Sequence, residues 1–159
     1  MERGEIMLKK VFIYILCLLP WFLSYLIPYD YSYYQTIKLP FFAPDNIFYI
    51  VAWTIVYILI AYSMYKVFIS YKFKEVPNSY KIVLLINYIC NQSYSLFFFG
   101  LKNPFLGFIS CITTFITSLF LYQETTNIKE DSNKYLNPYI ILSLFATILS
   151  LTIYIINSL

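Results

Sequence analysis

The polar side chains best suited to chemistry lie in one apolar segment in the second half of the chain. Asn87 and Asn91 are four positions apart, which places both amides on one face of a helix, and Gln92 follows directly. Tyr94 and Ser95 extend that face. An amide in hydrocarbon is costly unless it is hydrogen-bonded. These amides therefore either join helices or line a ligand cavity, and the two roles are compatible.

Aromatic and small polar residues follow helical spacing in the other apolar segments. Trp53 and Tyr57 are four apart, and one stripe near the C-terminus carries Leu142, Phe145, Ala146 and Leu149. Such a stripe more often reflects packing than a binding site. The Ser and Thr residues around Ser110 indicate close contacts between helices.

General acid-base and metal chemistry have little support in this sequence. There is no histidine, and the three cysteines, Cys17, Cys90 and Cys111, lie in apolar runs without zinc-binding spacing. We therefore expect no metal site. No Asp or Glu lies in the middle of an apolar segment, which argues against proton-coupled transport.

The composition is that of an integral membrane protein. Of 159 residues, 60% are hydrophobic and 12% are charged, whereas soluble domains average about 25% charged residues. The net charge of +3 gives no indication of nucleic-acid binding. A helix needs about 20 apolar residues to cross a bilayer. We predict an all-α integral membrane protein, residues 1–159 forming a single bundle of five transmembrane helices at about 11–28, 47–71, 82–101, 104–122 and 136–157.

Basic residues predict the orientation of this bundle. One side of the predicted spans holds Arg3, Lys9, Lys10, Lys72, Lys74, Lys81, Lys129 and Lys134, and the other holds Lys38 and Lys102. Because basic loops stay in the cytoplasm, we expect a cytoplasmic N-terminus and a C-terminus outside.

The connection between the first two spans, residues 30–46, is too apolar for a plain linker. Its two prolines fix their φ angles and remove two N–H donors. We predict that this connection is a structured lid over the mouth of the bundle, formed by Phe41, Phe42 and Pro44. Asp45 and Asn46 are predicted to cap the next helix.

Three motifs in order make the sequence resemble a known family. The first is Tyr33-Tyr34, then LPFFAPD at 39–45, then Trp53. The second is NYICNQSYSLFFFGLKNP at 87–104, and the third is PYIILSLFATILSLTIYIIN at 138–157. From about Tyr25 to Asn157 the chain resembles the TspO/translocator protein family, also called tryptophan-rich sensory proteins or peripheral-type benzodiazepine receptors.

The resemblance implies both a function and a set of site residues. Family members are five-helix membrane proteins, commonly homodimers, that bind porphyrins and isoquinoline-type ligands inside the bundle. We therefore expect a receptor or carrier for tetrapyrroles, with protoporphyrin IX as ligand and no required cofactor. The predicted ligand-binding residues are Tyr34, Phe42, Pro44, Trp53, Tyr57, Asn87, Asn91, Gln92, Tyr94, Ser110, Leu142, Phe145 and Ala146.

Two alternatives remain open, and departures from the family pattern bear on them. One is a porphyrin-degrading enzyme that uses light, oxygen and Trp53; the other is a stress-regulated scaffold with a vestigial pocket. Leu39, Phe42 and Asp45 replace the family's loop Lys, Trp and Pro, Ser110 its helix-four acid, and Leu142 its helix-five Trp. Tyr and Phe rings can still stack on a flat ligand, but they lack the ready photo-oxidation of indole, which weakens the enzymatic alternative. Without histidine, a metal-free porphyrin is expected rather than ligated haem.

Overall fold

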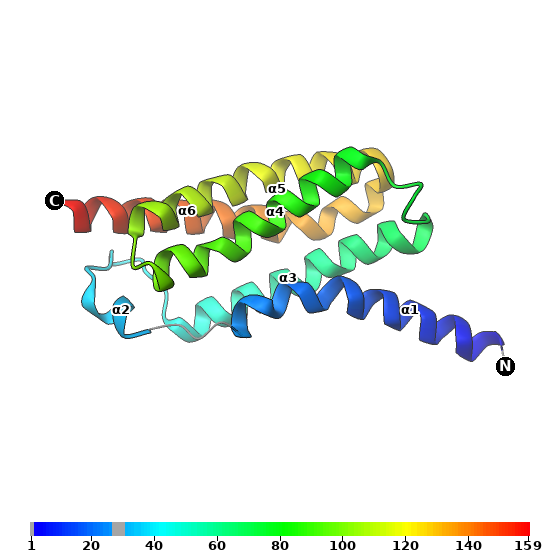
Figure 1. Cartoon of the computed structure of the whole chain (residues 1–159), viewed down its shortest axis with the longest axis horizontal. Helices are drawn as coiled ribbons and strands as arrows, with labels where there is room; N and C mark the ends of the chain where they lie inside the picture. The colour runs from blue at the N-terminus through cyan, green and yellow to red at the C-terminus, as the bar shows by residue number, and fades with distance from the viewer. Residues whose placement is uncertain (1, 27–30) are drawn as a thin grey trace.

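The computed structural model describes residues 2–26 and 31–159, and within them every regular element is helical (Figure 1). In chain order the elements are α1 Glu2–Leu18, the 3-10 helix η1 Leu19–Leu26, α2 Tyr31–Thr36, α3 Asn46–Ser70, α4 Asn78–Ser95, the π-helical turn η2 Leu96–Gly100, α5 Pro104–Asn133, the 3-10 turn η3 Lys134–Leu136, and α6 Asn137–Ser158.

The long helices α1, α3, α4, α5 and α6 run along the length of the molecule (Figure 1). Helix α5 packs against both α4 and α6, and α3 packs against α1, α5 and α6. Helix α1 lies at the outside of the bundle, and η1 is the part of the first span that reaches α4. This arrangement leaves the interior to be lined mainly by α3 to α6.

Among the described residues, four stretches are long and apolar enough to cross a membrane: Gly4–Leu23, Ile47–Ser70, Asn78–Gly100 and Pro104–Ser158. The last has 55 residues because it contains both α5 and α6, which run in opposite directions (Figure 1). The chain reverses after Lys129, whose φ of −151° and ψ of 83° break the helix. The predicted all-helical membrane fold is confirmed.

Two predicted spans differ from the observed helices at their ends. Helix α1 begins at Glu2 rather than 11, and α5 continues to Asn133 rather than 122. Polar residues precede the apolar stretch in α1 and follow it in α5. They limit the membrane-spanning stretch without ending the helix. The predicted end of the first span at 28 lies outside the described residues; Pro20, which has no N–H to donate, lies where α1 tightens into η1.

A tight turn at residues 101–103 makes α4 and α5 an antiparallel hairpin (Figure 1). Lys102 has a φ of 51°, so it reverses the chain in the left-handed region. The Asn103 Oδ1 accepts a hydrogen bond from the Leu106 N–H at 3.1 Å, and Pro104 stands in the first turn of α5, where its missing N–H costs nothing. This turn and residues 31–45 lie at the end of the bundle that carries the C-terminus (Figure 1).

The lid, defined here as residues 31–45, is fastened to that end of the bundle by a few hydrogen bonds. The Asn157 Oδ1 accepts from the Lys38 N–H, and its Nδ2 donates to the Lys38 carbonyl, both at 2.9 Å. The Tyr33 hydroxyl donates to the Lys102 carbonyl at 3.1 Å. Within the lid, the Ala43 N–H closes a turn onto the Pro40 carbonyl at 2.9 Å.

Two details of the predicted lid are wrong. Phe41 is fully exposed and points away from the bundle, whereas Phe42 packs on Phe145 with ring centroids 6.3 Å apart. Asp45 occupies the N-cap position of α3, but its side chain caps nothing; only its backbone carbonyl accepts, from Tyr49 N–H at 3.1 Å. The side chain of Asn46 lies outside what the structure describes.

The close approach of α5 to η2 depends on Gly107. A Cβ at this position would lie 2.8 Å from the Cδ2 of Phe98, which is completely buried. We expect Gly107→Ala to cost about 1–3 kcal/mol through overpacking, seen as a lower melting temperature of the purified protein in detergent. Gly4→Ala is the matched control, because its Cβ would meet nothing within 4 Å. Equal melting temperatures for the two variants would contradict this packing.

Candidate functional site

Asn87 on α4 is a structural amide that joins three helices. It is completely buried, and its Nδ2 donates to the Thr114 carbonyl at 3.1 Å and to the Thr117 Oγ1 at 2.8 Å, both on α5. The Tyr139 hydroxyl on α6 donates to its Oδ1 at 2.9 Å. Of the two roles open for this amide, the structure shows the interhelical one.

Asn91, one turn further along α4, belongs both to this network and to a cavity. Its Oδ1 accepts from the Tyr57 hydroxyl of α3 at 2.9 Å and from the Gln92 Nε2 at 3.4 Å. Its Nδ2 lies 3.5 Å from the Tyr139 hydroxyl, the longest bond of the set. Gln92 also donates to the Trp21 carbonyl at 3.4 Å, which brings η1 into the network.

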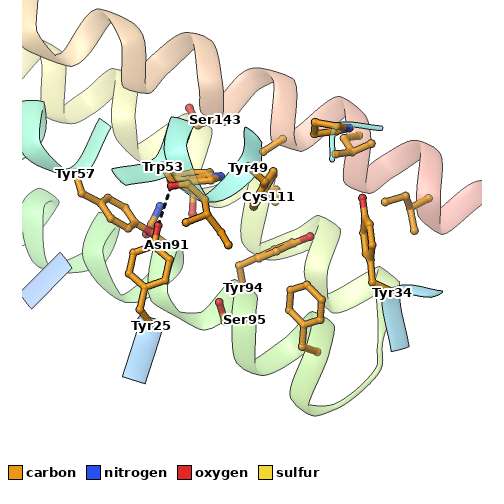
Figure 2. Close-up of a pocket in the computed structure, with 17 residues that line it drawn as sticks. Tyr25, Tyr34, Tyr49, Trp53, Tyr57, Asn91, Tyr94, Ser95, Cys111 and Ser143 are labelled. Carbon is orange, nitrogen blue, oxygen red and sulfur yellow. Dashed lines mark hydrogen bonds between the residues drawn. The ribbon is translucent and has the colours of Figure 1, made fainter. Parts of the chain in front are cut away.

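A cavity of about 100 Å³ lies inside the bundle, next to this network and below the lid (Figure 2). Its wall is mostly aromatic and aliphatic, and none of its 17 lining residues is Lys, Arg, Asp or Glu. The π-helical turn η2 carries Phe99 to this wall. π-Helical turns are rare and are found frequently at functional sites.

Two buried polar atoms on the cavity residues have no hydrogen-bond partner among the described residues: the Trp53 Nε1 and the Thr114 Oγ1. Trp53 is 8% exposed and Thr114 is 2% exposed. The Tyr49 hydroxyl lies near the indole N–H without reaching good hydrogen-bond geometry. Because an unpaired buried donor costs free energy, these atoms mark where a ligand's polar group would be stabilised.

Aromatic rings surround Trp53 on the cavity wall. Its ring centroid lies 5.6 Å from that of Tyr57, 6.0 Å from Tyr49 and 6.3 Å from Tyr139. Such spacing is typical of favourable aromatic contacts. A flat apolar ligand beside Trp53 would therefore meet the faces and edges of aromatic rings.

The structure brings seven of the predicted ligand-binding residues to this cavity: Tyr34, Pro44, Trp53, Tyr57, Asn91, Tyr94 and Ala146. Their contact with a ligand stays a prediction. The other six do not line it: Asn87, Gln92, Ser110, Phe42, Leu142 and Phe145.

Each of these six residues has another role in the bundle. Asn87 and Gln92 are used in the network, and the Ser110 hydroxyl donates to the Cys90 carbonyl at 2.6 Å. Phe42 and Phe145 pack on each other, and Leu142 packs on the core. A helix presents its residues around a full circle, so neighbours of a cavity residue often face another helix.

Sequence reasoning missed part of the wall, including Tyr25, Tyr49, Phe99, Cys111, Thr114 and Ser143. Tyr49 could have been found, since it precedes Trp53 by one helical turn and continues the Trp53–Tyr57 face. Ser143 precedes Ala146 by three positions on the α6 stripe. Tyr25 reaches the cavity from η1, and nothing in the sequence indicates the 3-10 geometry that turns it there.

Removal of the Asn87 amide tests its structural role. We expect Asn87→Ala to lower the melting temperature in detergent, at a cost of about 1–2 kcal/mol, because Tyr139 and Thr117 each lose a partner. Thr152→Ala is the control, since within the described residues the Thr152 hydroxyl bonds only to the Ile148 carbonyl of its own helix, at 2.8 Å. A melting temperature for Asn87→Ala as high as that of the control would rule out the network as a source of stability.

Comparison with known proteins shows which family this chain is similar to. The family model described as TspO/MBR family matches residues 12–155. The tryptophan-rich protein TspO of Bacillus cereus is 36% identical over 134 residues, covering 84% of this chain and 86% of that protein. The uncharacterized membrane protein YtaB of Bacillus subtilis is 34% identical over 130 residues, with 82% and 83% coverage.

A more distant relative extends the comparison to the archaea. The tryptophan-rich protein TspO of Archaeoglobus fulgidus is 28% identical over 131 residues, covering 80% of this chain and 81% of that protein. The family match spans η1 to η3 completely, together with α1 from residue 12 onward and most of α6. With its apolar helices, the chain is an integral, multi-pass membrane protein, and it belongs to the TspO/MBR family.

Proposed function

We propose that this protein is a membrane receptor or carrier that binds a porphyrin, or another flat apolar ligand of the isoquinoline type, in the cavity inside the bundle. The observation that carries this proposal is the uncharged aromatic cavity with two unpaired polar atoms, the Trp53 Nε1 and the Thr114 Oγ1. Rings supply apolar contact area, and the two polar atoms orient the ligand. Family membership supports the same assignment.

The size of the cavity adds a condition to this proposal. Sites for small molecules measure about 300–1,000 Å³, whereas this cavity has about 100 Å³. A porphyrin fits only if the wall moves outward. The lid supplies Tyr34 and Pro44 to the wall and is fastened at Lys38 and Tyr33 by exposed hydrogen bonds. The lid is therefore the part of the wall whose outward movement costs the least free energy.

Titration of protoporphyrin IX into purified protein tests the proposal. We expect saturable binding, followed by the porphyrin absorbance, with a dissociation constant below tens of micromolar and a higher melting temperature, because a ligand that binds the folded state stabilises it. Trp53→Phe keeps a ring but loses the indole N–H, so affinity should fall about two- to tenfold.

Trp21→Phe is the matched control, because Trp21 does not line the cavity. It should bind porphyrin as the wild type does. Absence of binding and of any melting-temperature shift, with porphyrins and isoquinolines alike, would refute the proposal and favour a scaffold with a vestigial pocket.

Photo-oxidative breakdown of the porphyrin is a second candidate function, supported by the place of Trp53 on the cavity wall. Indole is readily photo-oxidised when an excited ring is held against it. Illumination of the complex in air should then bleach the porphyrin band, and Trp53→Phe should abolish the bleaching. An unchanged spectrum in the wild type would reject catalysis while leaving binding intact.

A further inference from the structure

The threonines of α5 and α6 use their hydroxyls in one way, with a single exception. Six of the seven donate to the carbonyl four residues earlier in their own helix, at 2.7–2.8 Å: Thr113, Thr117, Thr125, Thr126, Thr147 and Thr152. This bond is the nearest way to satisfy a hydroxyl on a helix. Thr114 is the exception, because its Oγ1 is buried and has no hydrogen-bond partner among the described residues.

The neighbouring threonine explains why Thr114 departs from the others. A hydroxyl at position 114 would find the Ser110 carbonyl four residues earlier, but the Thr113 hydroxyl already donates to that carbonyl at 3.0 Å. The backbone of Thr114 is held as well, since the Asn87 Nδ2 on α4 donates to its carbonyl at 3.1 Å. Rotation of α5 toward another partner would break this bond between helices.

Thr114 lines the cavity and is almost completely buried. The other two polar side chains that α5 and α6 bring to this wall, Cys111 and Ser143, have partners of their own. The Cys111 Sγ lies 3.3 Å from the Ser150 Oγ. The Ser143 hydroxyl donates to the Ile140 carbonyl at 3.0 Å. On the α5 and α6 side of the cavity, the Thr114 hydroxyl is therefore the polar group that a ligand could satisfy.

The hydrogen of this hydroxyl determines which ligand group would be favoured. A buried donor without an acceptor costs free energy, and orphaned donors are rarer in proteins than acceptors with a spare lone pair. A carbonyl oxygen or an aromatic ring nitrogen on the ligand would accept this hydrogen bond, whereas a ligand donor would leave the hydrogen unused. An uncharged acceptor also enters an apolar cavity at a far lower cost than an ion.

We infer that Thr114 is a specificity-determining residue whose hydroxyl donates to the bound ligand, so that the cavity selects flat apolar molecules carrying an uncharged acceptor such as a carbonyl oxygen. This inference rests on the proposed function and names the ligand chemistry of the same site. It gives α5 a role separate from the ring contacts that Trp53 and Tyr57 supply from α3. The free protein keeps an unpaired hydroxyl, and the ligand removes that cost on binding.

The experiment compares two uncharged ligands that share one flat tricyclic ring system. Fluorenone carries a carbonyl where fluorene carries a methylene group, so the pair differs in one acceptor. Each is titrated into the full-length protein in a nonionic detergent, and the dissociation constant is measured by calorimetry. Thr114→Val removes the hydroxyl at nearly the same shape, and Thr114→Ser keeps it. Thr125→Val is the matched control, because Thr125 lies on the same helix, is completely buried and does not line the cavity.

The wild type, Thr114→Ser and Thr125→Val should bind fluorenone about two- to tenfold more tightly than fluorene, the range for one hydrogen bond. In Thr114→Val fluorenone should lose this advantage while the affinity for fluorene stays unchanged. Without ligand, the melting temperature of Thr114→Val should be no lower than that of the wild type, because the substitution removes an unpaired polar atom and no bond. A threonine with a purely structural role would instead show a fall.

Four results would overturn the inference and leave the proposed function standing. They are equal affinity of the wild type for the two ligands, a preference that survives in Thr114→Val, a preference lost in Thr125→Val, and a lower melting temperature of ligand-free Thr114→Val. Binding of protoporphyrin IX without binding of fluorenone would overturn it as well. Absence of binding by porphyrins, isoquinolines and both tricyclic ligands would refute the proposed function itself, and the inference with it.

Discussion

The fold depends on satisfying a few amides inside a hydrocarbon-like interior. In a bilayer no water compensates an unpaired N–H or carbonyl, so each buried amide either finds a partner or destabilises the bundle. Asn87 and Asn91 find theirs on three other helices through Thr114, Tyr57 and Tyr139. These bonds fix the rotation of α4 about its axis. That rotation decides which of its side chains face the cavity.

The cavity follows from this constraint. With Asn87 turned toward α5 and α6, the next turns of α4 present Asn91, Tyr94 and Ser95 to the interior. Helix α3 offers Tyr49, Trp53 and Tyr57 from the opposite side. Because these rings are large and stiff, they do not close completely on one another, and about 100 Å³ remains. The same rings that stabilise the bundle thus form a surface suited to a flat ligand.

The cavity wall carries no charged side chain. It would therefore accept an apolar molecule of suitable shape, including lipid. The lid supplies Tyr34 and Pro44 to this wall. The Asn157 amide holds the lid against the end of α6 through its two hydrogen bonds to the Lys38 backbone.

The sequence was sufficient to predict the membrane class and the helices, because the length of each apolar stretch is a local signal. It was also sufficient to find Trp53, Tyr57 and Asn91, which repeat at helical spacing. The sequence did not predict that hydrogen bonds to α5 and α6 would occupy the Asn87 amide. The rotation of α4 about its axis is set by its contacts with these two helices.

Other errors of prediction have the same physical origin. The length of α5 was underestimated because hydropathy reports the membrane core and not the helix. The exposure of Phe41 depends on the turn closed between Ala43 and Pro40, which sets the direction of the ring. The 3-10 path of η1 is likewise a tertiary outcome, and it decides the place of Tyr25.

The most direct test of the central claim is an experimental structure of the protein with protoporphyrin IX bound. The account predicts density for the ring inside the bundle, against Trp53 and Tyr57, with the lid displaced outward. Density for the porphyrin on the lipid-facing surface, with the cavity and the lid unchanged, would contradict it.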